Sequence, residues 1–181
     1  MKWIKDEDFL RGDIPMTKFD IRALTMAYLS IEAGDRFLDI GAGTGSISIE
    51  SGLQGAQVTA IEREEEGIEL IGANADKFSL DIEKILGQAP NDLPGAKFNK
   101  CFIGGSGGKL AEIMDYLEEH LEDCGILVAN FIMPENLTRF LDLLKEYDYK
   151  NIEVRLIQAS YMNRIGLMKA HNPIYIVKGE K

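Results

Sequence analysis

Cysteine is scarce in this chain of 181 residues, which has two cysteines, two histidines and one tryptophan. Cys101 and Cys124 lie in or beside apolar runs, and neither belongs to a CxxC pair. This pattern argues against a cysteine-rich zinc centre and against a redox-active dithiol. We therefore expect two buried, reduced thiols and no metal site.

Long apolar runs are missing too, and none approaches the length of a membrane span. The residues at positions 5–8 are all charged, so we expect no signal peptide, a cytoplasmic location and no membrane partner. Apolar residues nevertheless make up 45% of the chain, which is enough to build a core within one domain.

Positive charge is in deficit. The chain has 20 basic residues against 30 acidic ones and a formal net charge of −10. A surface of this sign repels nucleic acids and anionic membranes, so nucleic acid is not an expected partner. An anionic small substrate would need particular lysines or arginines in a local pocket.

Strand-like and helix-like segments alternate along the chain. We expect strands at residues 36–40, 57–61, 82–86, 98–103 and 126–131, and helices from Thr17, over 64–78, from 110 until Gly125, and from Pro134. Two further strand-like runs, 152–159 and 173–177, have no helix between them and should pair antiparallel. This order predicts an α/β fold with a mostly parallel seven-stranded sheet, helices on both faces and a C-terminal antiparallel hairpin. Within one domain we expect a helical cap at 1–30, a βα core at 31–150 and the terminal hairpin at 151–181.

A glycine-rich loop follows the first expected strand, in the stretch FLDIGAGTGSISIE at 37–50. Gly41, Gly43 and Gly45 alternate as GxGxG, which leaves backbone N–H groups free and lets a ligand approach closely. Glu62 closes the second strand 21 positions after Gly41, where an acidic residue can accept hydrogen bonds from ribose hydroxyls. The dinucleotide fingerprint is GxGxxG, so the GxGxG spacing disfavours NAD as the ligand. The alternative to a ligand-binding loop is a purely structural turn.

Six segments follow one another along the chain: GDIPMTK (12–18), DIGAGTGSISIE (39–50), AIERE (60–64), FIGGSGG (102–108), LVAN (127–130) and NPIYIV (172–177). In them the chain resembles the decarboxylating cobalt-precorrin methyltransferases of cobalamin biosynthesis, and the resemblance covers essentially the whole chain. It implies a Rossmann-like class I methyltransferase fold with S-adenosylmethionine as the cofactor. The implied reaction is methylation of an anionic tetrapyrrole, a corrin precursor, at the C15 bridge position, with loss of carbon dioxide from an acetate arm.

The resemblance also implies a set of cofactor-binding residues, namely Thr17, Asp39, Gly41, Ala42, Gly43, Thr44, Gly45, Glu62, Gln88 and Ala89. Thr17 has a second interpretation, because residues 17–20 have the pattern of a capping box that opens a helix. Many members of the family carry an acidic residue at the position of Gln88. The side-chain carbonyl of Gln88 can still accept a hydrogen bond from the adenine amine, but without the charge.

The segment GGSGG at residues 104–108 removes side chains from the end of a strand. Either the turn needs backbone angles that favour glycine, or something large lies against the backbone. The resemblance implies the second reading, with the substrate bordered by Gly104, Gly105, Ser106, Gly107 and Lys109. The alternative for this segment is an inert turn. Arg164, on the loop between the last two strands, is a further candidate for binding a substrate carboxylate, and the alternative is that its side chain stays solvated.

No catalytic base stands out, because methyl transfer from a sulfonium needs mainly alignment in a dry pocket. Catalytic residues therefore stay unassigned. Other functions are open to a chain that binds S-adenosylmethionine. It could methylate another small molecule, a protein or RNA, or it could be a non-catalytic S-adenosylmethionine-binding subunit. Five apolar residues crowd one expected loop, Tyr161, Met162, Ile165, Leu167 and Met168. Such a cluster is typical of an interface, and the resemblance implies a homo-oligomer, a tetramer. Packing of these residues against the chain's own sheet edge is the alternative.

Overall fold

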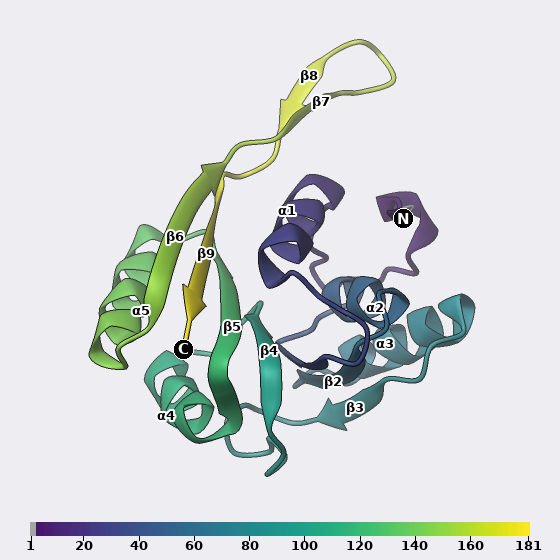
Figure 1. Cartoon of the computed structure of the whole chain (residues 1–181). Coiled ribbons are helices and arrows are strands. Elements are labelled where there is room, and N and C mark those ends of the chain that lie inside the picture. Colours follow the sequence, from purple (N-terminus) through teal and green to yellow (C-terminus); the bar gives the residue numbers. More distant parts are fainter. Residues whose placement is uncertain (1–2) are drawn as a thin grey trace.

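The structure is a computed structural model that describes residues 3–181 (Figure 1). A 3-10 helix spans Asp6–Asp8, and the α-helices are α1 (Phe19–Leu29), α2 (Ser46–Leu53), α3 (Glu65–Phe78), α4 (Leu110–His120) and α5 (Pro134–Glu146). The strands are β1 (Arg36–Ile40), β2 (Gln57–Glu62), β3 (Glu83–Leu86), β4 (Phe98–Ile103), β5 (Leu121–Phe131), β6 (Lys150–Ile157), β7 (Ser160–Met162), β8 (Met168–Ala170) and β9 (Ile174–Glu180).

Seven of the strands within residues 3–181 form one sheet in the order β3-β2-β1-β4-β5-β9-β6. Strands β1 to β5 run parallel, and β9 is antiparallel to both β5 and β6. The expected mostly parallel α/β sheet with a terminal antiparallel pair is therefore confirmed. The strand order reverses between β1 and β4, which are neighbours, and ligands in such sheets bind beyond the carboxyl ends at this switch point.

The helices cover both faces of the sheet, with α1, α2 and α3 on one face and α4 and α5 on the other (Figure 1). Alternation along each strand supplies apolar side chains to both faces. In β4, for example, Phe102 packs with the α1–α3 cluster, whereas Cys101 and Ile103 pack with the α4–α5 cluster. This double burial explains why strands carry consecutive apolar residues, as at 101–103 in β4 and 126–129 in β5, rather than strict alternation.

Helix α1 differs from its expectation in two ways. It begins at Phe19 with Lys18 at the N-cap, and no side chain caps it, so the capping-box interpretation of Thr17 is wrong. Its buried side also includes Arg22 and Thr25, two polar residues that an apolar pattern does not select. Arg22 can be buried because the N-terminal segment supplies polar partners for it.

The connection from α4 to β5 is also different from the prediction. Gly125 lies inside β5 rather than ending the helix, and the β4–β5 register skips residues 122–125. Cys124 lies in this irregularity with a φ of 62° and is exposed. The expectation of two buried thiols is therefore confirmed for Cys101 and wrong for Cys124.

Strands β7 and β8 form a separate two-stranded hairpin that projects from the end of β6 and β9 (Figure 1). Five of its apolar side chains are exposed: Tyr161, Met162, Ile165, Leu167 and Met168. Packing against the chain's own sheet edge is therefore wrong for these residues. The interface stays a prediction.

Within the described residues, no helix combines the length and the apolar character needed to cross a bilayer. The expectation of no signal peptide and the boundary of the 1–30 cap fall partly on Met1 and Lys2, which lie outside the described residues.

Candidate active site

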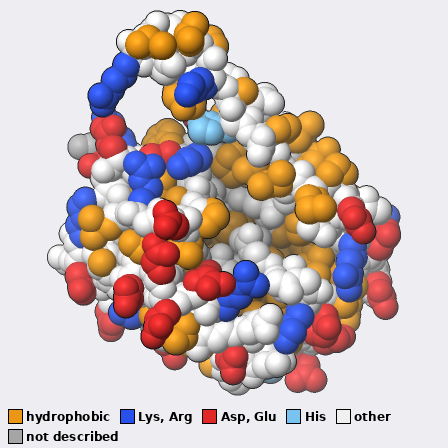
Figure 2. Space-filling view, turned by 180° about the vertical axis from the view of Figure 1, so that it is seen from behind, with side chains coloured by type: hydrophobic (Ala, Val, Ile, Leu, Met, Phe, Trp, Pro, Cys, Tyr) orange, Lys and Arg blue, Asp and Glu red, His pale blue; other side chains and the backbone are white. Residues whose placement is uncertain are grey.

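A cavity of about 440 Å³ lies at the carboxyl ends of β1, β2 and β4. Its volume falls within the range of about 300–1,000 Å³ that is usual for small-molecule sites. The face seen in Figure 2 is hollowed below the projecting hairpin. The lining comes from residues 14–18, 40–43, 61–64, 87–89 and 104–107, together with Ile47, Phe102, Asn130, Ile132 and Ile174.

The first glycine loop, residues 41–45 between β1 and α2, needs glycine for two physical reasons. Gly41, Gly43 and Gly45 have φ values of 70°, 57° and 75°, which residues with side chains rarely adopt. A Cβ at Gly41 would lie 2.7 Å from the carbonyl oxygen of Gly105, and a Cβ at Gly43 would lie 2.9 Å from that of Pro15. Backbone from two other segments therefore packs directly onto this loop.

Glu62 organises the first glycine loop from the end of β2. Its Oε2 accepts a hydrogen bond from the Gly43 N–H at 2.8 Å. Its Oε1 accepts from the N–H groups of Arg63 at 2.8 Å and Glu64 at 3.1 Å. The carboxylate lines the cavity in this fixed orientation, with acceptor capacity left for ligand hydroxyls.

The second glycine loop, residues 104–108 after β4, lies against the first. A Cβ at Gly104 would be 2.9 Å from the carbonyl oxygen of Gly41, and Gly107 and Gly108 have φ values of 56° and 85°. Gly105 is different, because its φ is not positive and no described atom lies within 4 Å of a Cβ built there. Three of the four glycines thus serve the turn, and Gly105 alone leaves space that is not needed by the fold.

Asp39 supports the first glycine loop from within β1 and does not line the cavity. It is fully buried in β1, where its Oδ2 accepts a hydrogen bond from the Ser48 hydroxyl at 2.5 Å. Burial raises the pKa of Asp39 to about 7, although the Ser48 bond opposes the rise. Within residues 3–181 its Oδ1 and the buried hydroxyl of Thr44 have no hydrogen-bond partner. Buried polar atoms without a partner are places where an ordered water is expected.

The structure brings most of the expected site residues together. The cavity is lined by Thr17, Gly41, Ala42, Gly43, Glu62, Gln88, Ala89, Gly104, Gly105, Ser106 and Gly107. Asp39, Thr44 and Gly45 lie outside the lining and support it. Lys109 and Arg164 also lie outside it, Lys109 at the N-cap of α4 and Arg164 in the exposed turn of the hairpin.

Sequence reasoning missed two basic residues in the lining, Lys18 and Arg63. Arg63 pairs with Glu64 at 3.0 Å, whereas Lys18 has no ion pair within the part of the chain that the structure describes. Their positions directly after Thr17 and Glu62 were the available signal. Asn130 was missed as well; it ends the LVAN segment, and its side-chain amide donates to the Thr25 hydroxyl at 3.1 Å.

The lining fits the chemistry of S-adenosylmethionine. Glu62 can accept from ribose hydroxyls, and the side-chain-free backbone at residues 41–43 permits close approach. Ile40, Ile61 and Ala89 provide apolar surface for a flat base, beside the polar side chain of Gln88.

A family model for the precorrin methyltransferase domain matches residues 8–179 of the chain. A cobalt-precorrin-6B C(15)-methyltransferase (decarboxylating) from Salmonella typhimurium is 38% identical, over 98% of this chain and 96% of the relative.

Two solved structures are similar over nearly their whole lengths. A precorrin-6y C5,15-methyltransferase from Geobacter metallireducens superposes with a TM-score of 0.90 at 31% identity, covering 98% of this chain and 96% of that one. A precorrin 8W decarboxylase from Methanobacterium thermoautotrophicum superposes with a TM-score of 0.88 at 26% identity, covering 97% and 98%.

Proposed function

The chain belongs to the precorrin methyltransferase family, and from this premise we propose that it methylates a cobalt-precorrin at C15 with S-adenosylmethionine and releases an acetate carboxyl as carbon dioxide. One observation carries the proposal. Two glycine loops meet at the β1–β4 switch point, and the cavity there is lined by both Glu62 and the open Gly105. This arrangement supplies a cofactor half and a substrate half that share one wall.

The cofactor half is assigned to the β1–β2 side of the cavity. When bound, the cofactor supplies an electrophilic methyl group on a sulfonium sulfur. Glu62 orients the ribose, the backbone of residues 41–43 accommodates the amino-acid end, and Gln88 with Ala89 flanks the adenine. Thr17 closes the site from the N-terminal side.

The substrate half is assigned to the second glycine loop. A tetrapyrrole does not fit with a cofactor inside about 440 Å³, so only the reacting edge of the ring enters, above Gly105. Ser106 can donate a hydrogen bond there, and Lys18 places a positive charge at the rim for an acetate or propionate arm. Lys109 and Arg164 lie farther out, where they would meet the more distant carboxylate arms.

The chemistry asks mainly for alignment and for exclusion of water. Apolar side chains such as Ile40, Ile61 and Phe102 keep the cavity dry near the transferred methyl group. The conjugated ring can take up the electron pair that carbon dioxide leaves behind. No protein base is therefore required for that step.

The experiment is incubation of the purified protein with cobalt-precorrin-6B and S-adenosylmethionine that carries an isotopically labelled methyl group. The expected product has gained one labelled methyl group and lost one carbon dioxide, as read by mass spectrometry. Heat-inactivated protein is the control. Transfer of label to RNA or protein but not to the corrin precursor would contradict the substrate. Cofactor binding without transfer to any acceptor would favour a non-catalytic subunit.

We further propose a cytoplasmic homotetramer assembled through the β7–β8 hairpin. The support is that Met162, Ile165, Leu167 and Met168 are each at least 60% exposed on a projecting element. Light scattering after size exclusion should report an oligomer that Ile165→Asp dissociates. The control is Leu53→Asp, at an exposed apolar residue at the end of α2. A clean monomer of the unaltered chain would contradict the proposal.

A further inference from the structure

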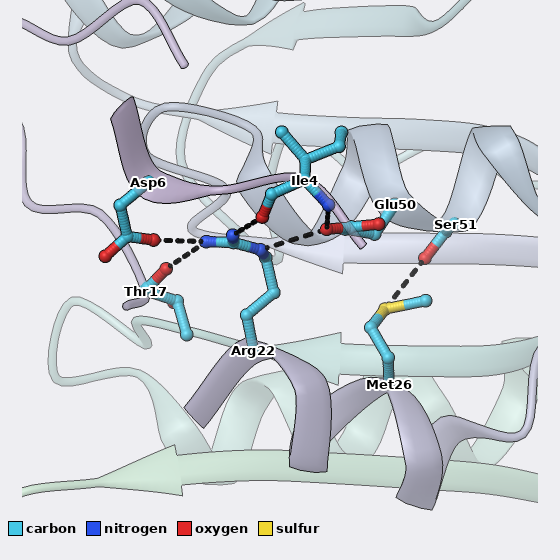
Figure 3. A network of polar contacts seen from close by, with 7 residues as sticks. All are labelled: Ile4, Asp6, Thr17, Arg22, Met26, Glu50 and Ser51. Carbon is cyan, nitrogen blue, oxygen red and sulfur yellow. Dashed lines mark hydrogen bonds and ion pairs between the residues drawn. The ribbon is translucent and has the colours of Figure 1, made fainter. Parts of the chain in front are cut away.

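Arg22 is a buried charged residue whose role the proposed function leaves unexplained. It lies on the inner side of α1 and is 1% exposed. Its Nη1 donates to the Thr17 carbonyl at 2.8 Å and to Asp6 Oδ1 at 3.0 Å, and its Nη2 donates to the Ile4 carbonyl at 2.5 Å. Its Nε donates to Glu50 Oε1 at 3.2 Å (Figure 3).

These bonds join three parts of the chain around one guanidinium. Ile4 and Asp6 belong to the N-terminal segment, Thr17 to the stretch that lines the cavity, and Glu50 to α2 (Figure 3). Helix α2 begins directly after the first glycine loop, so Glu50 connects Arg22 to the element that carries that loop. Glu50 is itself buried and also accepts from the Ile4 N–H at 3.1 Å.

Residues 15–18, the stretch that Arg22 contacts, lie against the first glycine loop. The Pro15 carbonyl oxygen is 2.9 Å from where a Cβ at Gly43 would be, and Thr17 and Lys18 line the cavity. The Arg22 side chain binds the Thr17 carbonyl, and the Arg22 backbone N–H binds the Lys18 carbonyl at 2.8 Å. Two successive peptide groups of the cavity wall are thus fixed by one residue.

We propose that Arg22 is a positioning residue of the cofactor site: it holds residues 15–18 against the first glycine loop in the arrangement that binds the ligand. The inference rests on the proposed function, because it takes the cavity to be the S-adenosylmethionine site. Only a guanidinium can serve the four acceptors at once, since its donors form a rigid planar fork and lysine has a single ammonium head. A lysine at position 22 would keep the charge beside Glu50 and lose most of this geometry.

A second anchor shows that the segment is held independently elsewhere. The side chain of Asn74, fully buried on α3, donates to the carbonyls of Leu10 and Thr44, both at 3.1 Å. Its Oδ1 accepts from the Leu10 N–H at 2.8 Å. Loss of Arg22 should therefore loosen residues 12–18 locally, while Asn74 keeps residues near Leu10 attached.

The test is Arg22→Lys in the full chain, with calorimetric binding of S-adenosylhomocysteine well below the unfolding midpoint. We expect affinity to fall about tenfold or more, as it does when the competent arrangement is populated in a tenth of molecules or fewer. Hydrogen exchange should rise at the backbone N–H groups of Asp13 and Arg22, which are bonded to Glu66 and to the Lys18 carbonyl, and stay unchanged in β1 and β4. The matched control is Arg36→Lys, which alters an exposed ion pair with Glu122. It should leave both readouts unchanged.

If Arg22 has only a structural role, Arg22→Lys should lower the unfolding midpoint and leave cofactor affinity and local hydrogen exchange unchanged. That result in folded Arg22→Lys would overturn the proposal. If Arg22→Lys does not fold, Arg22→Met with Glu50→Gln removes both buried charges and keeps an acceptor for the Ile4 N–H. The double variant must then show the same loss of affinity, and native affinity in it would overturn the proposal. Failure of the unaltered chain to bind S-adenosylhomocysteine would instead refute the proposed function.

Discussion

The two glycine-rich loops of this molecule have similar compositions and different physical reasons for them. In residues 41–45 every glycine has a positive φ, and backbone of other segments fills the space where two of the Cβ atoms would be. In residues 104–108, Gly105 has neither constraint and borders the cavity. The first loop is closed by protein, and the second leaves an opening.

Composition alone does not distinguish a glycine required by the backbone from one that leaves room for a ligand. The sign of φ and the surroundings of the missing Cβ do distinguish them. On that basis the first loop suits a cofactor that lies along the backbone. The second suits a substrate edge that occupies a gap.

The largest effect should come from filling the gap with Gly105→Leu. Turnover of the corrin precursor should fall on the order of a hundredfold, because a misplacement of about 1 Å can cost that much in rate. Affinity for S-adenosylhomocysteine should stay unchanged, and Gly105→Ala should be far milder. Steady-state kinetics and calorimetry measure the two quantities.

The matched control for this variant is Gly95→Leu, where a Cβ also meets nothing within 4 Å among the described atoms and φ is not positive. It lies outside the cavity lining and should keep full turnover. Full activity of Gly105→Leu would contradict the assignment of the gap to substrate. Loss of cofactor binding or of folding in that variant would mean that Gly105 serves the fold.

A smaller loss, well over tenfold in cofactor affinity, is expected for Gly43→Val. The φ of 57° and the Pro15 carbonyl 2.9 Å away leave no room for a branched side chain. Gly34→Val provides the control for strain alone, because Gly34 has a φ of 91° and open surroundings. The strain should lower the free energy of unfolding by about 1–3 kcal/mol in both variants. Unchanged affinity in Gly43→Val would reduce the first loop to a turn.

Much of the sheet could be predicted from the sequence, because doubly buried strands are short apolar runs. Residues 36–40 and 98–103 coincide with β1 and β4, and the position of Glu62 at a strand end was available from spacing alone. The β7–β8 hairpin could not be predicted, since its three-residue strands are exposed and have no periodic pattern.

The cavity wall was harder to predict than the loops. Arg22 has partners as far away as Ile4 and Glu50, so its burial depends on tertiary contacts that no helical period records. Lys18 and Arg63 follow the expected residues directly, yet nothing in the sequence says which side of the backbone they occupy.

A change in pH should affect the first loop through Asp39. Its pKa of about 7 in the folded chain exceeds the ordinary 3.8, so the folded state holds a proton that the unfolded state has lost. Stability from this group is therefore present below about pH 4 and is lost as pH rises to about 7, by about 1.4 kcal/mol per pH unit. Asp39→Asn should remove this contribution. Identical pH profiles of urea unfolding for both proteins would contradict it.

The smallest effect is expected for Gln88→Glu, at a cavity-lining side chain whose Nε2 lies 3.3 Å from where a Cβ at Gly107 would be. A charged acceptor for the adenine amine should raise cofactor affinity by about threefold to fivefold. Gln57→Glu, at the exposed start of β2, is the control. A fall in affinity would show that the ligand or the second loop needs the Gln88 amide as a donor.

The most direct test of the central claim, that the cavity between the two loops is an S-adenosylmethionine site, is calorimetry on the unaltered chain. S-adenosylmethionine and S-adenosylhomocysteine should both bind at one site per chain, and NAD should give no binding heat. The GxGxG spacing, where the dinucleotide fingerprint has GxGxxG, predicts this selectivity. Binding of NAD together with no response to S-adenosylmethionine or S-adenosylhomocysteine would contradict it.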